Sequence, residues 1–368
     1  MTCVPLTRAG TIAPIVDFLK RVGVRLDPVF AMAGLPPWIM ADRDALIPGT
    51  SPARLLGVAL RHADIPNLGL TAGERADIGR LGTFGRLIRS APSLGAALES
   101  AVRYSSTMTS NRPLDLRPRG EYVDFCMTIV DRFDPGDAAW QQDNQFSLGL
   151  MIAVVRLATG PSWRPAEVRL QTDESPGLRD AQSLAGVPVA FRQPMTMISI
   201  RRALLPMRLP AVSPTDVPGN VESWRSSAPA HDFAGSIRQA VETLACGERF
   251  PSVRQTADFV GMSVRTLQRR LAEAGVSHEV LVVQTRLATA AAVLEQTNGR
   301  ILDLAVDLGY SDHANFTRAF RRWVGCSPLE YRARHRRQRP GNRCAPEPRT
   351  NRIAPHRSDV ELGPSVQF

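Results

Sequence analysis

The stretch GMSVRTLQRRL, residues 261–271, decides how the second half of this chain folds. It follows an apolar helical pattern that opens at Ser252, and it places a glycine and a serine before a segment rich in Arg and Gln. Glycine after a helix end permits the left-handed backbone that reverses the chain. Serine in front of a helix accepts hydrogen bonds from its first free amides. The stretch therefore predicts a helix, a tight turn and a second helix with a polar outer face.

A second copy of this pattern lies at residues 301–323, with Gly309-Tyr310-Ser311 at its turn. Ser311 or Asp312 is expected to cap its second helix. The buried stripe of that helix is expected to consist of Phe316, Phe320 and Trp323. Two helices around such a turn form a helix-turn-helix motif, which places side chains in the major groove of DNA. The two copies predict one polypeptide that reads two grooves.

Side chains suited to base recognition lie on the outer faces that these motifs predict. In the first copy, Val264, Leu267 and Leu271 recur at helical spacing and are expected to pack inward. Arginine makes paired hydrogen bonds to guanine, and glutamine does so to adenine. A solvated, arginine-rich helix face is the alternative, and the capped turns and the second copy weigh against it. The residues that we expect to contact DNA are Arg265, Gln268, Arg269, His313, Thr317 and Arg318.

One helix is expected between the two motifs, from Ser277 to Thr297. At about 1.5 Å per residue, roughly 20 residues span about 30 Å, which is close to the ~34 Å of one turn of B-DNA. A strut of this length sets two recognition helices into successive major grooves. Because the two recognition helices differ in sequence, a single chain would read an asymmetric site.

The bulk composition agrees with a nucleic-acid partner and argues against several other classes of protein. The chain has 368 residues, enough for two domains, and a net charge of +10 with a pI of about 10.3 favours a polyanion. The five cysteines form no CxxC pair, so neither a zinc site nor a disulfide framework is expected. The longest apolar stretch, Leu148–Val155, is shorter than the roughly 20 residues of a membrane helix. We expect a cytoplasmic protein with no cofactor, metal or membrane attachment.

The first half of the chain is expected to contain both helices and strands. Residues 122–130 alternate between apolar and polar side chains, which predicts a half-buried strand. Residues 137–157 predict a long helix, and short strands are expected at 167–171, 189–191 and 196–200. The fold class is thus an α+β N-terminal regulatory domain, followed by an all-α DNA-binding domain with two helix-turn-helix motifs joined by a linker helix.

The domain boundaries follow from shifts in composition. Residues 210–230 are rich in Pro, Ser and Gly and predict an interdomain linker. The linker separates an effector-sensing or dimerising domain at 1–209 from the DNA-binding domain at 231–337. Residues 338–368 have little apolar pattern and predict a disordered basic tail.

A small-molecule pocket is expected between the strands and the helix at 137–157. Trp140 and the glutamines near it are candidates to line such a pocket. The alternative is that Trp140 and Phe146 belong to the hydrophobic core and that the domain mainly dimerises. For any single residue we favour the core.

Several short runs in both halves match a known family pattern. In the second half they are Val260–Ser263, Thr266–Leu271, Leu308–Tyr310, Phe316–Trp323 and Gly325–Arg332. The segment from His231 to Arg337 thereby resembles the DNA-binding domain of the AraC/XylS family of bacterial transcription regulators. Through Leu81–Gly85 and Arg89–Leu94, the first half is more weakly similar to the arabinose-binding-type regulatory domain of one AraC subgroup.

The resemblance implies a sequence-specific regulator that binds a promoter or operator in double-stranded DNA. It implies most often an activator that contacts RNA polymerase, with a small-molecule effector and a homodimer through the N-terminal domain. The label of the first domain transfers no ligand. A repressor of the same family is the alternative. A DNA-binding module fused to a repair-type enzyme is a weaker one, because that chemistry needs an activated cysteine beside a histidine. A non-specific architectural binder relies on backbone contacts, which need no unequal recognition helices. We expect no catalytic residues.

Overall fold

The computed structural model describes most of the chain. The described residues are 3–62, 65, 67–130, 133–213, 217–245 and 250–337. For residues 336 and 337 only the backbone is described. They divide into two compact units. The first unit comprises Met1–Ala290 with Asp307–Gly309, and the second comprises Ala291–Val306 with the chain from Tyr310 onward. The predicted basic tail at 338–368 lies outside the described residues.

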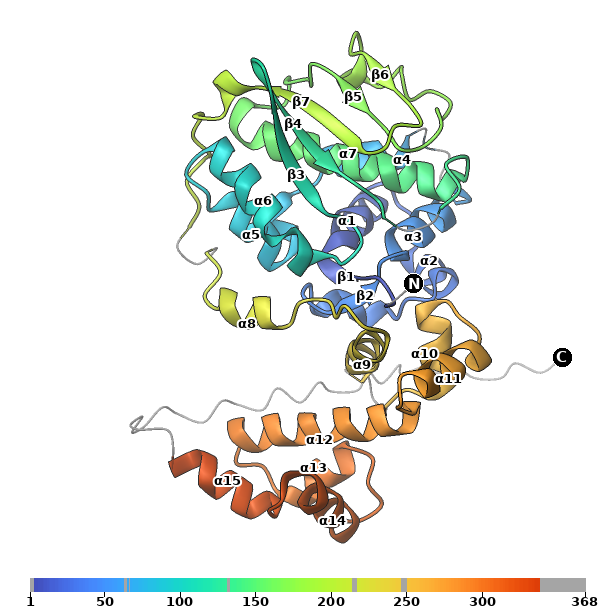
Figure 1. Cartoon of the computed structure of the whole chain (residues 1–368), viewed down its shortest axis with the longest axis vertical. Coiled ribbons are helices and arrows are strands. Elements are labelled where there is room, and N and C mark those ends of the chain that lie inside the picture. The colour runs from blue at the N-terminus through green and yellow to red at the C-terminus, as the bar shows by residue number, and fades with distance from the viewer. Residues whose placement is uncertain are drawn as a thin grey trace, which may run out of the picture. The chain divides into compact units, whose positions relative to one another are not determined.

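A five-stranded sheet and the helices against it form the N-terminal part of the first unit (Figure 1). The strands, in sheet order, are β3 (Leu114–Arg119), β4 (Tyr122–Met127), β7 (Thr196–Arg201), β5 (Val168–Arg169) and β6 (Val189–Ala190). All neighbours are antiparallel except β5 and β6. The long helix α7 (Ala138–Thr159) lies along one face of this sheet. The α+β class expected for this half is confirmed.

The remaining elements of this part precede the sheet or surround it. Two short strands, β1 (Leu6–Arg8) and β2 (Leu46–Pro48), pair with each other. The helices are α1 (Ala13–Arg21), α2 (Leu26–Ala33), α3 (Ser51–Leu60), α4 (Leu68–Glu74), α5 (Thr83–Arg89) and α6 (Leu94–Met108). The alternation at 122–130 was the one strong strand signal in the sequence, so β1, β2 and β3 were not foreseen.

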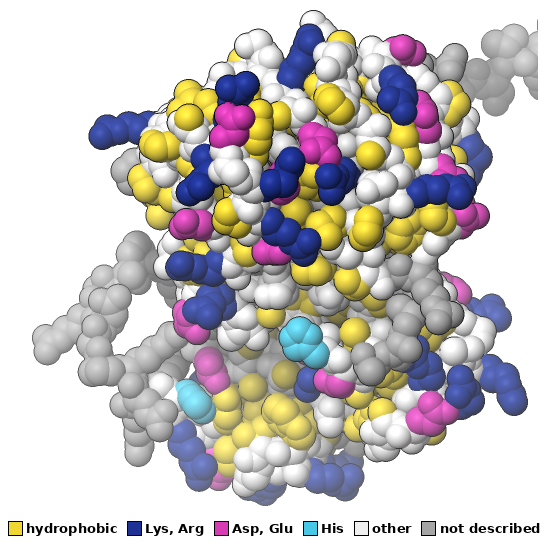
Figure 2. Space-filling view, turned by 45° about the horizontal axis from the view of Figure 1, so that its top comes forward, with side chains coloured by type: hydrophobic (Ala, Val, Ile, Leu, Met, Phe, Trp, Pro, Cys, Tyr) yellow, Lys and Arg dark blue, Asp and Glu magenta, His cyan; other side chains and the backbone are white. Residues whose placement is uncertain are grey.

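Strand β4 differs from the half-buried strand that its alternation predicted. Asp124 and Cys126, on the polar side of the alternation, are buried like Phe125 on the other, with 8% and 2% of their surfaces exposed. The reason is that long side chains of the neighbouring strands cover this face: Arg119 donates to the carboxylate of Asp124 and to the Oγ of Ser199. Burial accordingly raises the pKa of the Cys126 thiol to about 11. Figure 2 shows Arg and acidic side chains intermingled on the N-terminal part, a mixed surface rather than a basic one.

Helices α4 and α7 cross at backbone contact because glycines stand at the crossing. A Cβ on Gly149 would lie 2.6 Å from the carbonyl oxygen of Leu70, and Cβ atoms on Gly69 and Gly73 would overlap the α7 backbone. At the same crossing, Gln142 accepts a hydrogen bond from the amide of Gly69 at 2.7 Å. This satisfies one of the free amides at the start of α4. The crossing thus fixes the centre of the N-terminal part.

The core of the N-terminal part continues into the first helix-turn-helix motif. Helix α9 (Phe233–Leu244) packs beside β2, and its Ile237 and Val241 are fully buried. A single cluster of buried side chains joins the first two helices of the chain, α9, α10 (Val253–Val260) and α11 (Val264–Glu273). A hydrogen bond also joins the N-terminus to α9: the backbone amide of Val4 donates to Ser236 Oγ at 3.0 Å. The first compact unit therefore includes the first motif.

The stretch at 210–230, predicted to be a linker, contains a short helix, α8 (Val221–Ser226). Its Trp224 is buried, with 6% of its surface exposed. The compact units thus do not follow the predicted linker, and the domain boundaries stay a prediction.

The second unit contains the second motif apart from Asp307–Gly309. Helix α12 (His278–Gln296) runs across the boundary between the units, and α13 (Ile301–Asp307), α14 (His313–Val324) and α15 (Pro328–Arg337) follow it. Phe316 and Phe320 are fully buried, and the rings of Tyr310 and Tyr331 pack edge-on against them. The Tyr331 hydroxyl donates to Glu295 at 2.6 Å, which raises the pKa of Tyr331 to about 12.

Trp323 is a correction to the predicted core stripe of α14. Its side chain is 47% exposed, whereas Phe316 and Phe320 are buried. The rings of Tyr310 and Tyr331 pack on the two phenylalanines, whereas within the described part of the chain no aromatic ring packs on Trp323. Spacing alone placed it in the stripe, but about half of its surface stays in contact with solvent.

In the described residues, no helix is long and apolar enough to cross a membrane. Over the same residues, no cluster of histidine, cysteine and acidic side chains is arranged to hold a metal ion.

Replacing Gly73 by Ala tests the helix crossing. We expect Gly73→Ala to lower the free energy of unfolding by about 1–3 kcal/mol, because the new methyl group forces α4 away from α7. Urea unfolding of the full chain measures it. The matched control is Gly219→Ala, whose methyl group would meet open space. Equal stability of the two variants would show that the helices do not depend on backbone contact.

Candidate DNA-binding interface

Local sequence shapes the first motif as expected. Ser252 accepts from the amide of Gln255 while the Gln255 side chain accepts from the amide of Ser252, which is a complete capping box. At the turn, Gly261 has φ +74°, a conformation that side chains disfavour. Ser263 then caps α11 by accepting from the amide of Thr266 at 3.1 Å. The start of α10, the turn and the start of the recognition helix α11 are therefore each fixed by local sequence.

The second motif uses the same plan with a different cap. Gly309 has φ +77° at the turn. Of the two candidate caps, the structure selects Asp312, whose carboxylate accepts from the amide of Asn315 at 2.7 Å. This hydrogen bond lowers the pKa of Asp312, since it stabilises the charged form. A further reciprocal pair between Ser327 and Glu330 opens α15.

All three residues expected to contact DNA from the first motif lie on the exposed side of α11. Leu267 and Leu271 face the core with 0% and 1% of their surfaces exposed, whereas Arg265, Gln268 and Arg269 are exposed. Arg270 differs, because its guanidinium stacks at 3.9 Å over the ring of Phe233 in α9. Arg270 therefore holds the recognition helix to α9, whereas the three exposed side chains form the face that α11 presents to solvent.

Arg269 is paired on its own helix. Its guanidinium donates to Glu273, one turn further along, at 2.6 Å, and both side chains are more than half exposed. An exposed pair of this kind contributes little to stability. It does, however, orient the arginine on the outer face and leaves it free to exchange a carboxylate partner for a base edge or phosphate.

The exposed face of α14 is more varied than the sequence suggested. His313 and Arg318 are exposed. Thr317 is half-buried, and its hydroxyl oxygen is shielded without a hydrogen-bond partner in the described part of the chain. Thr317 thus lies at the edge of this face.

Asn315 is a further residue of this face that the sequence analysis missed. Its amide oxygen accepts from Arg318, and its amide nitrogen donates to the capping carboxylate of Asp312. Asparagine is a residue that reads adenine in pairs of hydrogen bonds. Asn315 follows the capping residue by three positions, and this spacing places it in the first turn of α14. The sequence left the cap open between Ser311 and Asp312, so the spacing was not used.

The residues proposed to line an effector pocket serve structural roles. Trp140 is half-buried and stacks on Phe133, with ring centroids 5.3 Å apart. Gln142 caps α4, and Gln145 donates to Ser175. Phe146, given as a core residue in the alternative, is buried with 1% of its surface exposed and lines an apolar cavity of the first unit.

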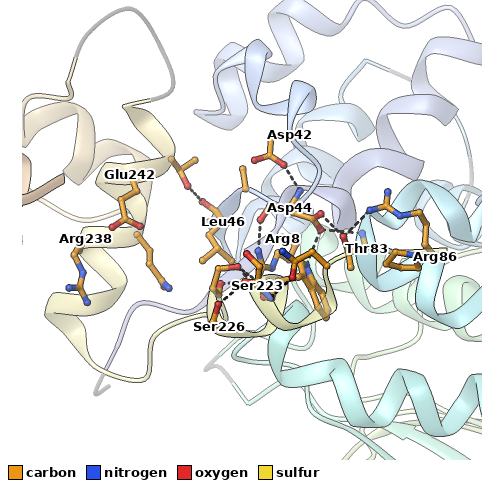
Figure 3. A pocket seen from close by; sticks show the side chains of 18 residues that line it. Arg8, Asp42, Asp44, Leu46, Thr83, Arg86, Ser223, Ser226, Arg238 and Glu242 are labelled. Carbon is orange, nitrogen blue, oxygen red and sulfur yellow. Dashed lines mark hydrogen bonds between the residues drawn. The ribbon is translucent and has the colours of Figure 1, made fainter. Parts of the chain in front are cut away.

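A polar pocket lies beside the connection from α8 to α9, within the first unit (Figure 3). Its volume is about 760 Å³, and Arg8, Asp44 and Thr83 lie at its centre. Arg8 donates to the carbonyl oxygens of four residues, Thr107, Asp44, Trp224 and Ser227. Asp44 in turn accepts from the indole of Trp224 and from both the amide and the hydroxyl of Thr83. These charged groups join the connection to the N-terminal part.

Both halves of the chain match models of known protein families. Residues 23–209 match the family model described as the arabinose-binding domain of AraC transcription regulator, N-terminal. Residues 256–334 match a helix-turn-helix domain.

Relatives match over most of the chain. The chain is 26% identical over 350 residues to the HTH-type transcriptional regulator VirS of Mycobacterium tuberculosis, covering 89% of this chain and 96% of that protein. It is 23% identical over 339 residues to the ornithine utilization regulator of Pseudomonas aeruginosa, covering 89% and 98%. The crystal structure of the transcriptional regulator CdpR from Pseudomonas aeruginosa aligns with a TM-score of 0.40 at 21% identity, covering 87% and 96%.

The cap of α11 is testable by itself. Ser263→Ala removes the acceptor for the Thr266 amide, and we expect it to destabilise the start of α11 by about 1 kcal/mol. Hydrogen exchange at the Thr266 amide reports the loss. Ser263→Asn, which keeps a capping acceptor, serves as the control and should retain the protection. The cap would be irrelevant to α11 if the amide exchanged at the same rate in all three proteins.

Proposed function

The chain belongs to the AraC family of transcription regulators and is a DNA-binding regulator, and from that premise we propose that it reads an asymmetric site with two unequal recognition helices. The observation that supports this most is the exposed face of α11, where Arg and Gln side chains stand on a helix that is capped, buried on its other side and held to α9. Those side-chain types recognise guanine and adenine edges in the major groove.

The residues proposed to contact DNA are Arg265, Gln268 and Arg269 of α11, and His313, Thr317 and Arg318 of α14. Asn315 joins them because it supports Arg318 on the same face. Helix α12 has 19 residues, and at about 1.5 Å each it spans somewhat under 30 Å. That length supports the proposal that, on DNA, the two helices enter successive major grooves.

Membership of the family supports the remaining parts of the proposal. The protein acts in the cytoplasm as an activator that contacts RNA polymerase at a promoter, with repression by the same binding mode as the alternative. An effector bound by the N-terminal half regulates it, and that half also forms a homodimer. The division into a regulatory domain at 1–209, a linker at 210–230 and a DNA-binding domain at 231–337 belongs to the same proposal.

The chemistry of Cys126 favours a regulator over a repair-type enzyme fused to a DNA-binding module. A nucleophilic cysteine needs a lowered pKa and an exposed, electropositive setting. Burial instead raises the pKa of Cys126 to about 11, and its thiol donates to the carbonyl oxygen of Asp124. Its place on β4, an interior strand of the sheet, is therefore structural.

Replacing Arg269 by Ala tests base recognition by α11. We expect Arg269→Ala to weaken binding to the protein's selected site by about 1–3 kcal/mol and to relax the preference at one base pair. Titration of the full chain against duplexes that carry each base at each position measures both effects.

The control is Arg254→Ala, which removes an equally exposed arginine from α10, the other helix of the motif. It should change affinity for all sequences alike or not at all. A uniform loss for Arg269→Ala as well, accompanied by a smaller dependence on salt, would make Arg269 a phosphate contact and contradict its role in base recognition.

A further inference from the structure

A second cavity of the first unit lies deeper than the polar pocket. It has a volume of about 110 Å³ and is enclosed by side chains of α5, α6, β4 and α7. It thus lies between the sheet and the long helix that crosses its face (Figure 1). A cavity of about 150 Å³ is known to bind benzene, so this space suits a molecule of about one ring.

The walls of the cavity are apolar and adaptable. Phe84, Ile88 and Phe125 form part of them, and three methionines complete them: Met108, Met127 and Met151. All six side chains are at least nine-tenths buried. Methionine side chains have soft, unbranched ends that adjust to an occupant. An apolar molecule would therefore replace an empty space without displacing hydrogen-bonded groups.

One end of the cavity carries a buried ion pair. Arg112, with 8% of its surface exposed, lines the cavity together with Ser147 and donates to the Ser147 hydroxyl at 3.2 Å. It also pairs with Asp143, which is fully buried. Desolvation raises the pKa of that carboxyl and Arg112 opposes the shift. The second carboxylate oxygen of Asp143 has no hydrogen-bond partner in the described part of the chain.

A buried ion pair in a cavity wall is hard to explain by stability. Removing two charges from water costs more than their attraction returns unless every donor and acceptor is satisfied, and apolar residues of equal size are often at least as stable. In the polar pocket near α8, by contrast, Arg8 and Asp44 each form hydrogen bonds to several protein groups. Arg112 instead lines a mostly apolar space. A few polar groups converging on an apolar cavity are the mark of a ligand site.

We infer that this cavity binds a small, electrically neutral and mostly apolar molecule with a single oxygen that accepts a hydrogen bond from Arg112. The inference rests on the proposed function, since it gives the effector of the regulator a site and a chemical class. Neutrality follows because Asp143 already balances the charge of Arg112. A carboxylate in the ligand would bring a second negative charge to a guanidinium that Asp143 already neutralises. The oxygen must accept because a guanidinium only donates.

The cavity adjoins the contacts that hold the connection to α9. Thr7 lines the cavity, and the next residue, Arg8, bonds to Trp224 and Ser227 at the connection. Arg8 also bonds to the carbonyl oxygen of Thr107, the neighbour of the cavity residue Met108. An occupant of the cavity thus touches the residues adjacent to that junction.

Phenol, toluene and benzoate are the probes that test the inference. They share one ring and differ in carrying a neutral hydroxyl, no oxygen or an anionic carboxylate. In full-length protein labelled at methionine methyl groups, we expect phenol to shift the NMR signals of Met108, Met127 and Met151 saturably. The exposed Met32 and Met207 report non-specific binding and should not shift. We expect toluene to bind about tenfold more weakly than phenol, the effect of losing one hydrogen bond to a charged group. We expect benzoate to bind more weakly as well, because its charge must be buried without a counter-charge of its own.

Two sets of variants locate the binding. Ala101→Leu fills the cavity from α6 and should abolish the shifts, whereas Ala96→Leu, the same change on the same helix outside the cavity, should keep them. The double variant Arg112→Met, Asp143→Leu replaces the ion pair by apolar groups, which preserves folding, and should bind phenol no better than toluene.

Absence of shifts at the three cavity methionines, or equal shifts in Ala101→Leu and the wild type, would overturn the inference. DNA binding is measured on the same samples without any probe. A protein that binds phenol as expected but no specific DNA would overturn the proposed function and leave the cavity assignment standing.

Discussion

The buried guanidinium of Arg8 is the interaction on which the first unit most depends. Its side chain is inserted where β1, β2, α6 and α8 approach one another, and it donates to backbone carbonyl oxygens at 2.7–3.1 Å. It also stacks over the ring of Trp224 at 5.2 Å. Burial lowers the pKa of Arg8, and the carboxylates of Asp44 and Asp42 oppose that shift. A buried charge with five donors is tolerated only where acceptors surround it, so each segment that supplies a carbonyl is held in place.

This constraint reaches the recognition helix through the core. Trp224 is fixed by Arg8 and by the carboxylate of Asp44, so the chain enters α9 in a defined position. Helix α9 then shares one hydrophobic cluster with α10 and α11, and Arg270 of α11 stacks on its Phe233. The first recognition helix is therefore part of the same folded unit as the N-terminal half. A ligand that binds two arrangements of this unit unequally would shift the position of α11 between them.

The parts of the molecule that could be predicted from sequence are the local ones. Ser252, Gly261 and Ser263 specify caps and a turn through neighbours within four residues, so the sequence pattern and the structure agree. The inward and outward faces of α11 followed from spacing for the same reason. Trp323 was misplaced, because spacing gives a direction on a helix but not a partner opposite it.

The features that escaped prediction depend on residues far apart in the chain. In the sequence, Gly73 and Gly149 are like any glycine within a helix. Their need to be glycine follows only from the crossing of α4 and α7. The burial of Asp124 needed Arg119 of the adjacent strand β3, and Arg112 becomes a candidate ligand contact only once Asp143 and the cavity are in place. Likewise, nothing in the sequence near Arg8 indicates that it bonds to Trp224.

The central claim is that one chain reads DNA with two different recognition helices. Selection of bound duplexes from a random pool by the full-length protein tests this most directly. The account predicts an enriched motif with two unlike elements centred about one helical turn, roughly 10 base pairs, apart. Substitutions in α11 should alter one element and substitutions in α14 the other. Recovery of a single element, of two identical elements that respond together, or of no enriched sequence would contradict it.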